Sequence, residues 1–109
     1  MKNDKMFLIT RLDLSPGQQA VQSAHVLTEF IFEHQYEASR WKNESNTIVL
    51  LAVDNENQLL QLLNQARQQL ISNSLFKEPD LQDAITAIAL APGNATYKLC
   101  KTLSLALNK

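Results

Sequence analysis

Three polar side chains near residue 20 have the spacing of one face of a helix and could contact an anion or an ester. Gln18, Gln22 and His25 follow one another at i, i+4 and i+7. They come directly after a Ser-Pro-Gly turn at residues 15–17, and the N-terminus of a helix offers free backbone N–H groups and a positive dipole end to phosphate or carboxylate. A purely structural explanation also exists, in which Gln18 completes an S-x-x-Q capping box and His25 is a packing residue. The spacing alone favours capping, because capping accounts for it without a ligand.

A second candidate group is the acidic segment at residues 78–83, Glu-Pro-Asp-Leu-Gln-Asp. Its three carboxylates lie between two segments of strand type, where they can orient a water molecule or accept a hydroxyl proton. Proline and aspartate are also ordinary turn formers. From the residues alone, turn chemistry is the simpler explanation.

Thr86 is the third candidate, because it stands near the start of an otherwise apolar strand and could present its hydroxyl at the sheet edge. A β-branched threonine is also simply a good strand former. The short motifs typical of phosphate loops, dinucleotide binding, serine hydrolases and zinc proteases do not occur. One cysteine, Cys100, and two distant histidines exclude a disulfide within the chain and make a zinc site unexpected.

The elements that would position these groups follow from the apolar pattern. Strands are expected at residues 6–12, 47–53, 74–77, 84–91 and 103–107, and helices at residues 15–36, 55–71 and 95–101. Residues 35–46 are expected to form a polar connection that contains Trp41. This alternation of strands and helices predicts an α/β domain with a mostly parallel sheet, and it places the loop after the first strand at the carboxyl edge.

Regular apolar stripes predict which faces of the two longer helices are buried. In the first helix the stripe consists of Ala20, Ala24, Leu27 and Ile31, widened by Val21, Thr28 and Phe32. In the second helix it consists of Leu59, Leu62, Leu63, Ala66 and Leu70. The continuous run at residues 47–53 is typical of a central strand covered on both faces.

Length and composition are those of one globular domain, which we expect to span residues 1–109. The apolar runs are too short to span a membrane, and the N-terminal residues lack the apolar core of a signal peptide. A cytoplasmic protein without a membrane partner is therefore expected. The formal net charge of −1 gives no global nucleic-acid footprint, so any contact with RNA would come from a local patch.

Taken in order, these segments resemble the class II peptidyl-tRNA hydrolase family. The family's R-x-D-L after the first strand corresponds to Arg-Leu-Asp-Leu at residues 11–14, and its A-A-Q-x-A-H helix to Ala-Val-Gln-Ser-Ala-His at residues 20–25. Its T-x-L-x-I-x-P strand corresponds to residues 86–92, and its final threonine and short strand to residues 102–105. The resemblance covers residues 5–107 and agrees with the order of elements given above.

The resemblance implies a three-layer α/β/α sandwich around a small, mostly parallel or mixed four-stranded sheet, and a homodimer. It also implies hydrolysis of the ester that joins a peptide or an amino acid to tRNA, without a metal or an organic cofactor. Family activity is attributed to a lysine at the start of the first helix, an aspartate before the T-x-L strand, and a nearby glutamine and threonine.

One position of the family pattern differs in a way that bears on activity. Gln22, His25 and Thr86 stand on matching positions, whereas Gln18 stands where the family has its lysine. A neutral amide stabilises a developing oxyanion, or holds a phosphate, less well than an ammonium group does. The loss of one such group typically lowers a rate by a factor on the order of 10²–10³.

The acidic segment is also shorter than the aspartate-bearing loop of the family. Asp80 is the best candidate for the retained carboxylate, and Asp83 remains an alternative. The resemblance therefore implies catalytic roles for Asp80, Thr86, Gln18 and Gln22, and substrate contacts for Gly17, His25 and Arg11.

The leading hypothesis is a diverged ester hydrolase of the peptidyl-tRNA hydrolase type. The alternative is a catalytically inert binding or dimerisation module that keeps the fold, which the glutamine at position 18 and the short acidic segment suggest. A third hypothesis is a regulatory domain that binds a small anion at the start of the first helix.

Overall fold

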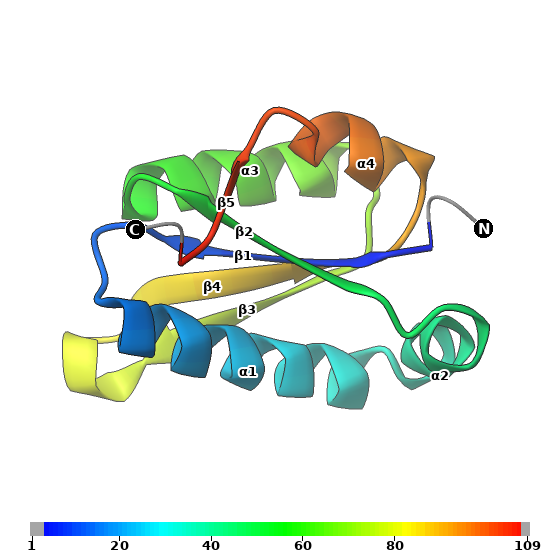
Figure 1. The fold of residues 1–109 in the computed structure, drawn as a ribbon, viewed down its shortest axis with the longest axis horizontal. Helices are drawn as coiled ribbons and strands as arrows, with labels where there is room; N and C mark the ends of the chain where they lie inside the picture. Colours follow the sequence, from blue (N-terminus) through cyan, green and yellow to red (C-terminus); the bar gives the residue numbers. More distant parts are fainter. Residues whose placement is uncertain (1–3, 108–109) are drawn as a thin grey trace.

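A five-stranded mixed sheet lies between two layers of helices in the computed structural model, which describes residues 4–107 (Figure 1). The strands stand in the order β3-β4-β1-β2-β5. Their bounds are β1 Met6–Arg11, β2 Ile48–Val53, β3 Asn73–Glu78, β4 Ala84–Leu90 and β5 Ser104–Leu105. The two ends of the domain predicted over residues 1–109 lie outside the described residues.

Helices α1 (Pro16–Glu33) and α2 (Gln35–Glu44) lie on one side of the sheet, and α3 (Glu56–Gln68) and α4 (Asn94–Cys100) on the other (Figure 1). A short 3-10 helix, η1 (Pro79–Leu81), joins β3 to β4. The three-layer α/β/α fold is therefore confirmed. No helix of the described part of the chain is long and apolar enough to cross a membrane.

The resemblance implied a mostly parallel or mixed sheet of four strands, and the sheet is mixed but has five strands. Only β1 and β2 are parallel, whereas the pairs β1–β4, β3–β4 and β2–β5 are antiparallel. A five-residue connection joins β3 to β4, which is too short for the crossover that a parallel pair needs. The central strand is β1, and β2 has only the two-residue β5 on its outer side.

The buried face of α1 is not the apolar stripe that the sequence predicts. Ala20, Ala24 and Ile31 of that stripe are exposed and Leu27 is half-buried. The buried positions are instead Gln19, Gln22, Ser23, Val26 and Phe30. Hydrogen bonds explain this rotation, because the three buried polar side chains all find partners and so avoid the cost of burying an unpaired polar group.

Gln19 ties the start of α1 to two loops. Its amide Nε2 donates to Leu14 O at 2.9 Å, and its Oε1 accepts from Leu107 N at 3.1 Å. The residue is only 4% exposed, so without these two bonds its amide would be buried with no hydrogen-bond partner. The C-terminal segment is thereby fixed against the first helix.

The polar connection expected at residues 35–46 is a helix. It contains neither glycine nor proline, its Ala38 and Trp41 are buried, and Arg40 and Glu44 form an i, i+4 ion pair. Trp41 Nε1 donates to Thr47 O at 2.8 Å, which fixes α2 to the start of β2. A helix with one narrow apolar edge resembles a loop in a sequence pattern, and that explains the wrong prediction.

The stripe predicted for α3 is largely confirmed. Leu59, Leu62, Leu63 and Ala66 are buried in the cluster on the α3 side of the sheet. Leu70 is 90% exposed, because the helix ends at Gln68 and Leu70 has a left-handed φ of 60°. Cys100 is buried in the same cluster, and its burial raises the pKa of the thiol to about 12, so that it remains protonated.

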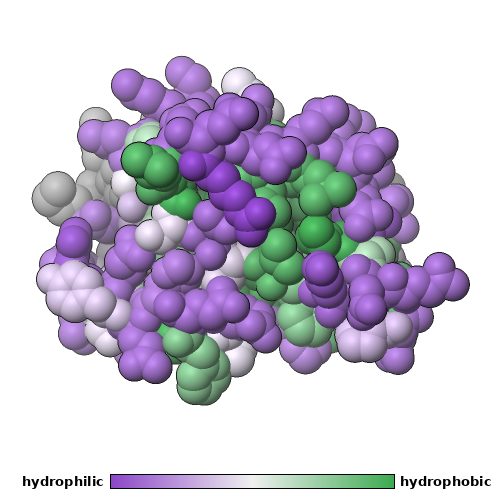
Figure 2. All heavy atoms as spheres, turned by 180° about the vertical axis from the view of Figure 1, so that it is seen from behind, coloured by the Kyte–Doolittle hydropathy of each residue, from purple (hydrophilic) through white to green (hydrophobic). Residues whose placement is uncertain are grey.

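The outer edge of β3 is a free sheet edge on the side of the molecule seen in Figure 2, where apolar side chains gather over one part of a mostly hydrophilic surface. Leu75 and Phe76 are half-buried on this strand, and exposed Lys77 follows them. A charged residue on an edge strand opposes pairing with another chain. The partner strand β4 carries a bulge opposite Phe76 and Lys77. The same bulge shapes the site described below.

The rotation of α1 can be tested with two phenylalanines of the same helix. Phe30 is 0% exposed and Phe32 is 70% exposed. We expect Phe30→Ala to lower the free energy of unfolding by about 3–5 kcal/mol, because it leaves a cavity in the core. Phe32→Ala is the matched control and should change it by less than about 1 kcal/mol. Urea denaturation measures both values, and equal losses would contradict the observed orientation of the helix.

Candidate active site

Thr86 is the extra residue of a β-bulge in the β3–β4 pair. Phe76 pairs with Ala87 and the next residue, Lys77, pairs with Ile85, so Thr86 falls between two pairs. Ile85 and Ile88 both belong to the core on the α3 side, although strict alternation along a strand would separate them. A bulge changes the direction of a side chain in this way, and here it turns the hydroxyl of Thr86 toward α1.

A chain of hydrogen bonds runs from this hydroxyl toward the surface. Thr86 Oγ1 donates to Gln22 Oε1 at 2.5 Å, and Gln22 Nε2 donates to Glu78 Oε1 at 2.8 Å. The two bonds fix the orientation of the amide, since an ionised carboxylate only accepts. Thr86 and Gln22 are 0% and 4% exposed, whereas Glu78 is half-buried. This series of hydrogen bonds therefore ends at Glu78, the one member of the three that is accessible to solvent or to a substrate.

Glu78 is held as a carboxylate by its neighbours. The bond from Gln22 is the main reason that its pKa lies below the ordinary 4.5, and the bond from the backbone N–H of Asp80 is the second. The positive charge that His25 carries when protonated lowers the pKa of Glu78 further. A carboxylate of this kind is ionised at neutral pH and can accept hydrogen bonds from a water molecule.

An open hollow lies in front of Gln22 and Glu78. It has a volume of about 390 Å³, near the lower end of the range for ligand pockets. Its lining consists of Gly17, Gln18, Val21, Gln22, Glu78, Asp80 and Leu81. Its apolar surface comes from Val21 and Leu81, and its two carboxylates from Glu78 and Asp80. None of the lining residues is basic.

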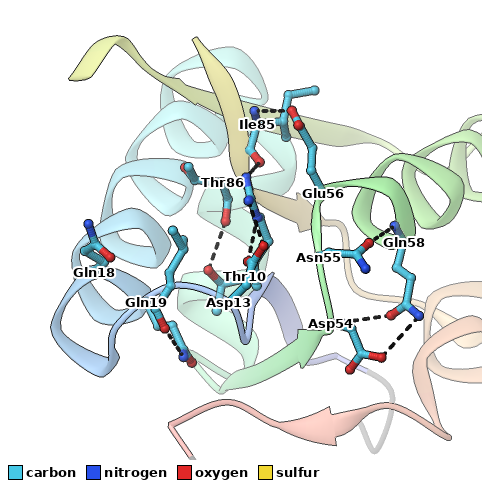
Figure 3. A network of polar contacts seen from close by, with 12 residues as sticks. Thr10, Asp13, Gln18, Gln19, Asp54, Asn55, Glu56, Gln58, Ile85 and Thr86 are labelled. Atoms are coloured by element: carbon cyan, nitrogen blue, oxygen red, sulfur yellow. Dashed lines mark hydrogen bonds and ion pairs between the residues drawn. The ribbon is translucent and has the colours of Figure 1, made fainter. Parts of the chain in front are cut away.

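Gln18 lies at the rim of the hollow but is engaged in capping α1. Its Oε1 accepts from Ser15 N at 3.0 Å, and its own N–H donates to Ser15 Oγ at 3.1 Å. These bonds form the capping box that the sequence predicts. Figure 3 shows that Gln18 does not point toward Thr86. Gly17, which precedes it, faces open space, because a Cβ added there would meet no atom within 4 Å.

His25 lies beside the site and stacks on an aromatic ring. Its imidazole lies parallel to the ring of Phe76, with 4.4 Å between the ring centroids and an angle of 7°. It is exposed on α1, one turn after Gln22. The stacked ring covers the strand that leads to Glu78.

Arg11 is occupied by contacts within the protein. Its Nε and Nη2 donate to the two oxygens of Asp13 at 2.9 Å each, and its Nη1 donates to Ile85 O at 3.0 Å. The bonds to Asp13 are the main reason that the pKa of Arg11 is raised. The expected role in substrate binding has no support in this geometry, because all three guanidinium nitrogens have protein partners.

Of the predicted site residues, the structure brings Gln22 and Thr86 into contact and places Gln18, Gly17 and Asp80 around the hollow. Asp83 does not line it and follows Gln82 in a left-handed turn. Glu78 belongs to the acidic segment that the sequence singles out, but the sequence reasoning did not prefer it to Asp80 or Asp83. Its position directly at the end of β3 was the available signal, since a residue at a strand end is held more firmly than one in the following turn.

Among residues 4–107, no group of three or more His, Cys, Asp or Glu side chains is placed to hold a metal ion. The polar groups of the site are two carboxylates, two amides and a hydroxyl.

Fold and site together define a small α/β/α-sandwich protein with an amide–carboxylate site between its first helix and its β3–β4 connection. The family model of peptidyl-tRNA hydrolase PTH2 matches residues 5–105, and the chain belongs to this family. A peptidyl-tRNA hydrolase of Thermococcus sibiricus is 32% identical over 99 residues, covering 82% of this chain and 84% of that protein.

A solved structure with the same fold supports the architecture. It is a protein of unknown function from Agrobacterium tumefaciens strain C58, with a TM-score of 0.69 and 17% sequence identity. The alignment covers 96% of this chain and 98% of that one. The likeness concerns the fold alone.

The lowered pKa of Glu78 predicts how the site contributes to stability as the pH changes. Above the ordinary value of 4.5 the contribution of the ionised form is complete, and it is lost as the pH falls through the lower pKa of the folded state. The variant Glu78→Gln cannot ionise. We expect wild type to be more stable than this variant at pH 7, and the difference in melting temperature to shrink progressively below pH 4.5. A difference that stays constant down to pH 2.5 would contradict the lowered pKa.

Proposed function

We propose that this protein hydrolyses the ester that joins a peptide, or an amino acid, to tRNA. Membership of the peptidyl-tRNA hydrolase PTH2 family supports the reaction class. The observation that supports the place of the reaction is the chain from Thr86 through Gln22 to Glu78, which ends in an ionised carboxylate at an open hollow.

In this proposal Glu78 orients the attacking water and accepts its proton as the bond to the carbonyl carbon forms. The C–O bond to the tRNA ribose then breaks, and the ribose oxygen leaves with that proton. Its low pKa makes it a weak base, so orientation is the larger part of its contribution. Gln22 fixes the carboxylate, and Thr86 acts through Gln22, since its hydroxyl is buried beneath the amide. Asp80 holds Glu78 through its backbone N–H, and its own carboxylate is the second acceptor at the hollow.

The substrate's ester lies in this proposal against Gly17 and the start of α1. The Gly17 N–H is not used by the capping box and is therefore the donor we assign to the developing oxyanion. His25 and the parallel ring of Phe76 offer a flat surface beside the hollow, on which a base or an aromatic side chain can stack. Arg11 we assign to the protein's own structure.

Turnover in this proposal is slow compared with a relative that has the family lysine. The lining of the hollow contains two carboxylates and no basic residue, so a polyanionic substrate gains no local charge attraction there. Gln18 is neutral, and its amide oxygen already accepts from the backbone of Ser15. Restoring a cation at this rim would add the missing electrostatic stabilisation.

The release of an N-acetylated amino acid from its tRNA ester, followed by acid precipitation, tests the activity. We expect wild type to hydrolyse the ester and Glu78→Ala to lose a factor of about 10²–10³ in kcat. Gln18→Lys should raise kcat/KM by at least about tenfold, because the lysine supplies a positive charge. Glu29→Gln, a charge change elsewhere on α1, is the control. A wild type without activity, made active only by Gln18→Lys, would favour the inert module instead.

We also propose that the protein is a homodimer that acts as a single domain in the cytoplasm, where tRNA esters occur. An apolar strip on α1 supports the dimer, since Ala20, Ala24 and Ile31 are exposed. Ile48 lies on the same face of the sheet as α1, since its register partner Met6 belongs to the α1-side core. Its side chain is 47% exposed. A second copy of this strip would cover the part of β2 that α1 leaves open.

Light scattering after gel filtration tests the dimer. We expect a dimeric mass for wild type and a monomeric mass for Ile31→Glu, because a charge in an apolar interface is not compensated there. Gln61→Glu adds the same charge to the exposed side of α3 and should leave the dimer intact. A monomeric wild type, or a dimeric Ile31→Glu, would exclude this interface.

A further inference from the structure

Beside the bulge at Thr86, peptide groups of β4 bond to three side chains and not to the backbone of the neighbouring strand β1. Glu56 Oε2 accepts from Ile85 N at 2.9 Å, and Arg11 Nη1 donates to Ile85 O at 3.0 Å. Thr10 Oγ1 donates to Thr86 O at 2.9 Å. Figure 3 shows Glu56 reaching Ile85 from α3, and Thr10 lying beside Thr86. We refer to these three bonds as the bulge contacts.

The neighbouring strand β1 does not pair with this part of β4. Its register with β4 ends at the pair Thr10 and Ala87. Beyond that pair the chain turns toward β2, where Leu12 N donates to Val53 O at 2.8 Å. Ile85 and Thr86 are buried, and buried peptide groups need partners. Side chains from β1 and α3 therefore supply bonds that a regular strand would supply.

Two of the side chains that form the bulge contacts are themselves held in place. Arg11 is fixed by its two bonds to Asp13, and the pair is a fork-shaped contact between a guanidinium and a carboxylate. Glu56 lies in the first turn of α3, and the buried Leu59, one turn further along, packs this end of the helix into the core. The bulge contacts thus connect two rigid element ends to the residue before Thr86.

We propose that Glu56 and Arg11 are positioning residues for the candidate active site. They hold the peptide groups of Ile85, and thereby keep Thr86 in the bulge with its hydroxyl on Gln22 and, through Gln22, the carboxylate of Glu78 in place. Neither residue lines the hollow, so in this proposal neither contacts the ester. The proposal rests on the proposed function, since it assigns these residues to the same reaction.

Kinetics of Glu56 variants, measured on an N-acetylated aminoacyl-tRNA, test the proposal. Glu56→Ala removes the acceptor for Ile85 N–H and should lower kcat by about 10- to 100-fold, because a small displacement of a catalytic group has effects of this size. KM should remain within about twofold, since no contact to substrate is lost. Glu56→Gln keeps an oxygen acceptor and should restore most of kcat.

Two further variants separate positioning from general destabilisation. Asn55 caps the same helix, since its Oδ1 accepts from Gln58 N at 3.0 Å, and it has no bond to Ile85. Asn55→Ala removes this cap and should leave kcat unchanged. In a Thr86→Val background, where the hydroxyl is absent, Glu56→Ala should lower kcat by less than about threefold, because residues that act through one another are not additive. An undiminished effect of Glu56→Ala in that background, or an equal loss in Asn55→Ala, would overturn the proposal.

A measurement that does not depend on activity distinguishes failure of this proposal from failure of the proposed function. The side-chain amide protons of Gln22 and the backbone amide of Ile85 are observable by NMR. Glu56→Ala and Arg11→Lys should shift the Gln22 signals and speed exchange at Ile85, whereas Asn55→Ala should do neither. These changes in a protein without hydrolase activity would support the positioning and reject the reaction; their absence would overturn the positioning in either case.

Discussion

The hydrogen bond between the hydroxyl of Thr86 and the amide of Gln22 determines how the first helix sits on the sheet. It joins two almost fully buried polar groups from distant parts of the chain. Leaving either group unpaired would cost on the order of 1–3 kcal/mol, as much as burying one apolar side chain contributes. The bond can form only if Gln22 faces the sheet, and Gln22 then stands one turn before Val26 on the buried face. The orientation of α1 thus follows from its polar residues as much as from Val26 and Phe30, and the more regular apolar stripe of Ala20, Ala24 and Ile31 lies outside.

The same bond requires an irregular strand on the other side. A regular β4 would turn Thr86 toward α3, away from Gln22, because side chains alternate between the two faces. The bulge removes that alternation at one residue. β1 pairs with β4 only as far as Ala87, so it supplies no backbone partner to Ile85 and Thr86. Glu56, Arg11 and Thr10 supply these partners. The strand β4 therefore contributes both to the apolar core and to the polar site, because the bulge at Thr86 reverses the side of the sheet that its side chains face.

Elements whose pattern is set by local rules could be predicted from the sequence. The capping box at Ser15 and Gln18, the stripe of α3 and the strand cores all appear in the structure close to their expected bounds. What could not be predicted depends on contacts between distant residues. The bulge is invisible because residues 84–91 are almost entirely apolar, so the sequence shows no alternation that could be seen to break. The rotation of α1 depends on Glu78 and Thr86, which lie more than fifty residues away. Only the resemblance to the peptidyl-tRNA hydrolases connected Gln22 with Thr86, and it directed attention to Asp80 although Glu78 makes the contact.

Gln18 shows why one substitution changes both the electrostatics and the local structure at this site. A lysine at the start of a helix adds a cation where the dipole end is already positive, which is unfavourable for the helix itself. Glutamine is favourable for the helix, since its amide closes the capping box with Ser15 and adds no positive charge. The gain for the helix and the loss for an anionic transition state arise from the same side chain. A carboxylate held ionised by Gln22, with no cation at the rim, stabilises a water molecule rather than a developing negative charge. In the proposed reaction the site therefore keeps a group that can orient the attacking water, while stabilisation of the transition state falls to backbone N–H donors.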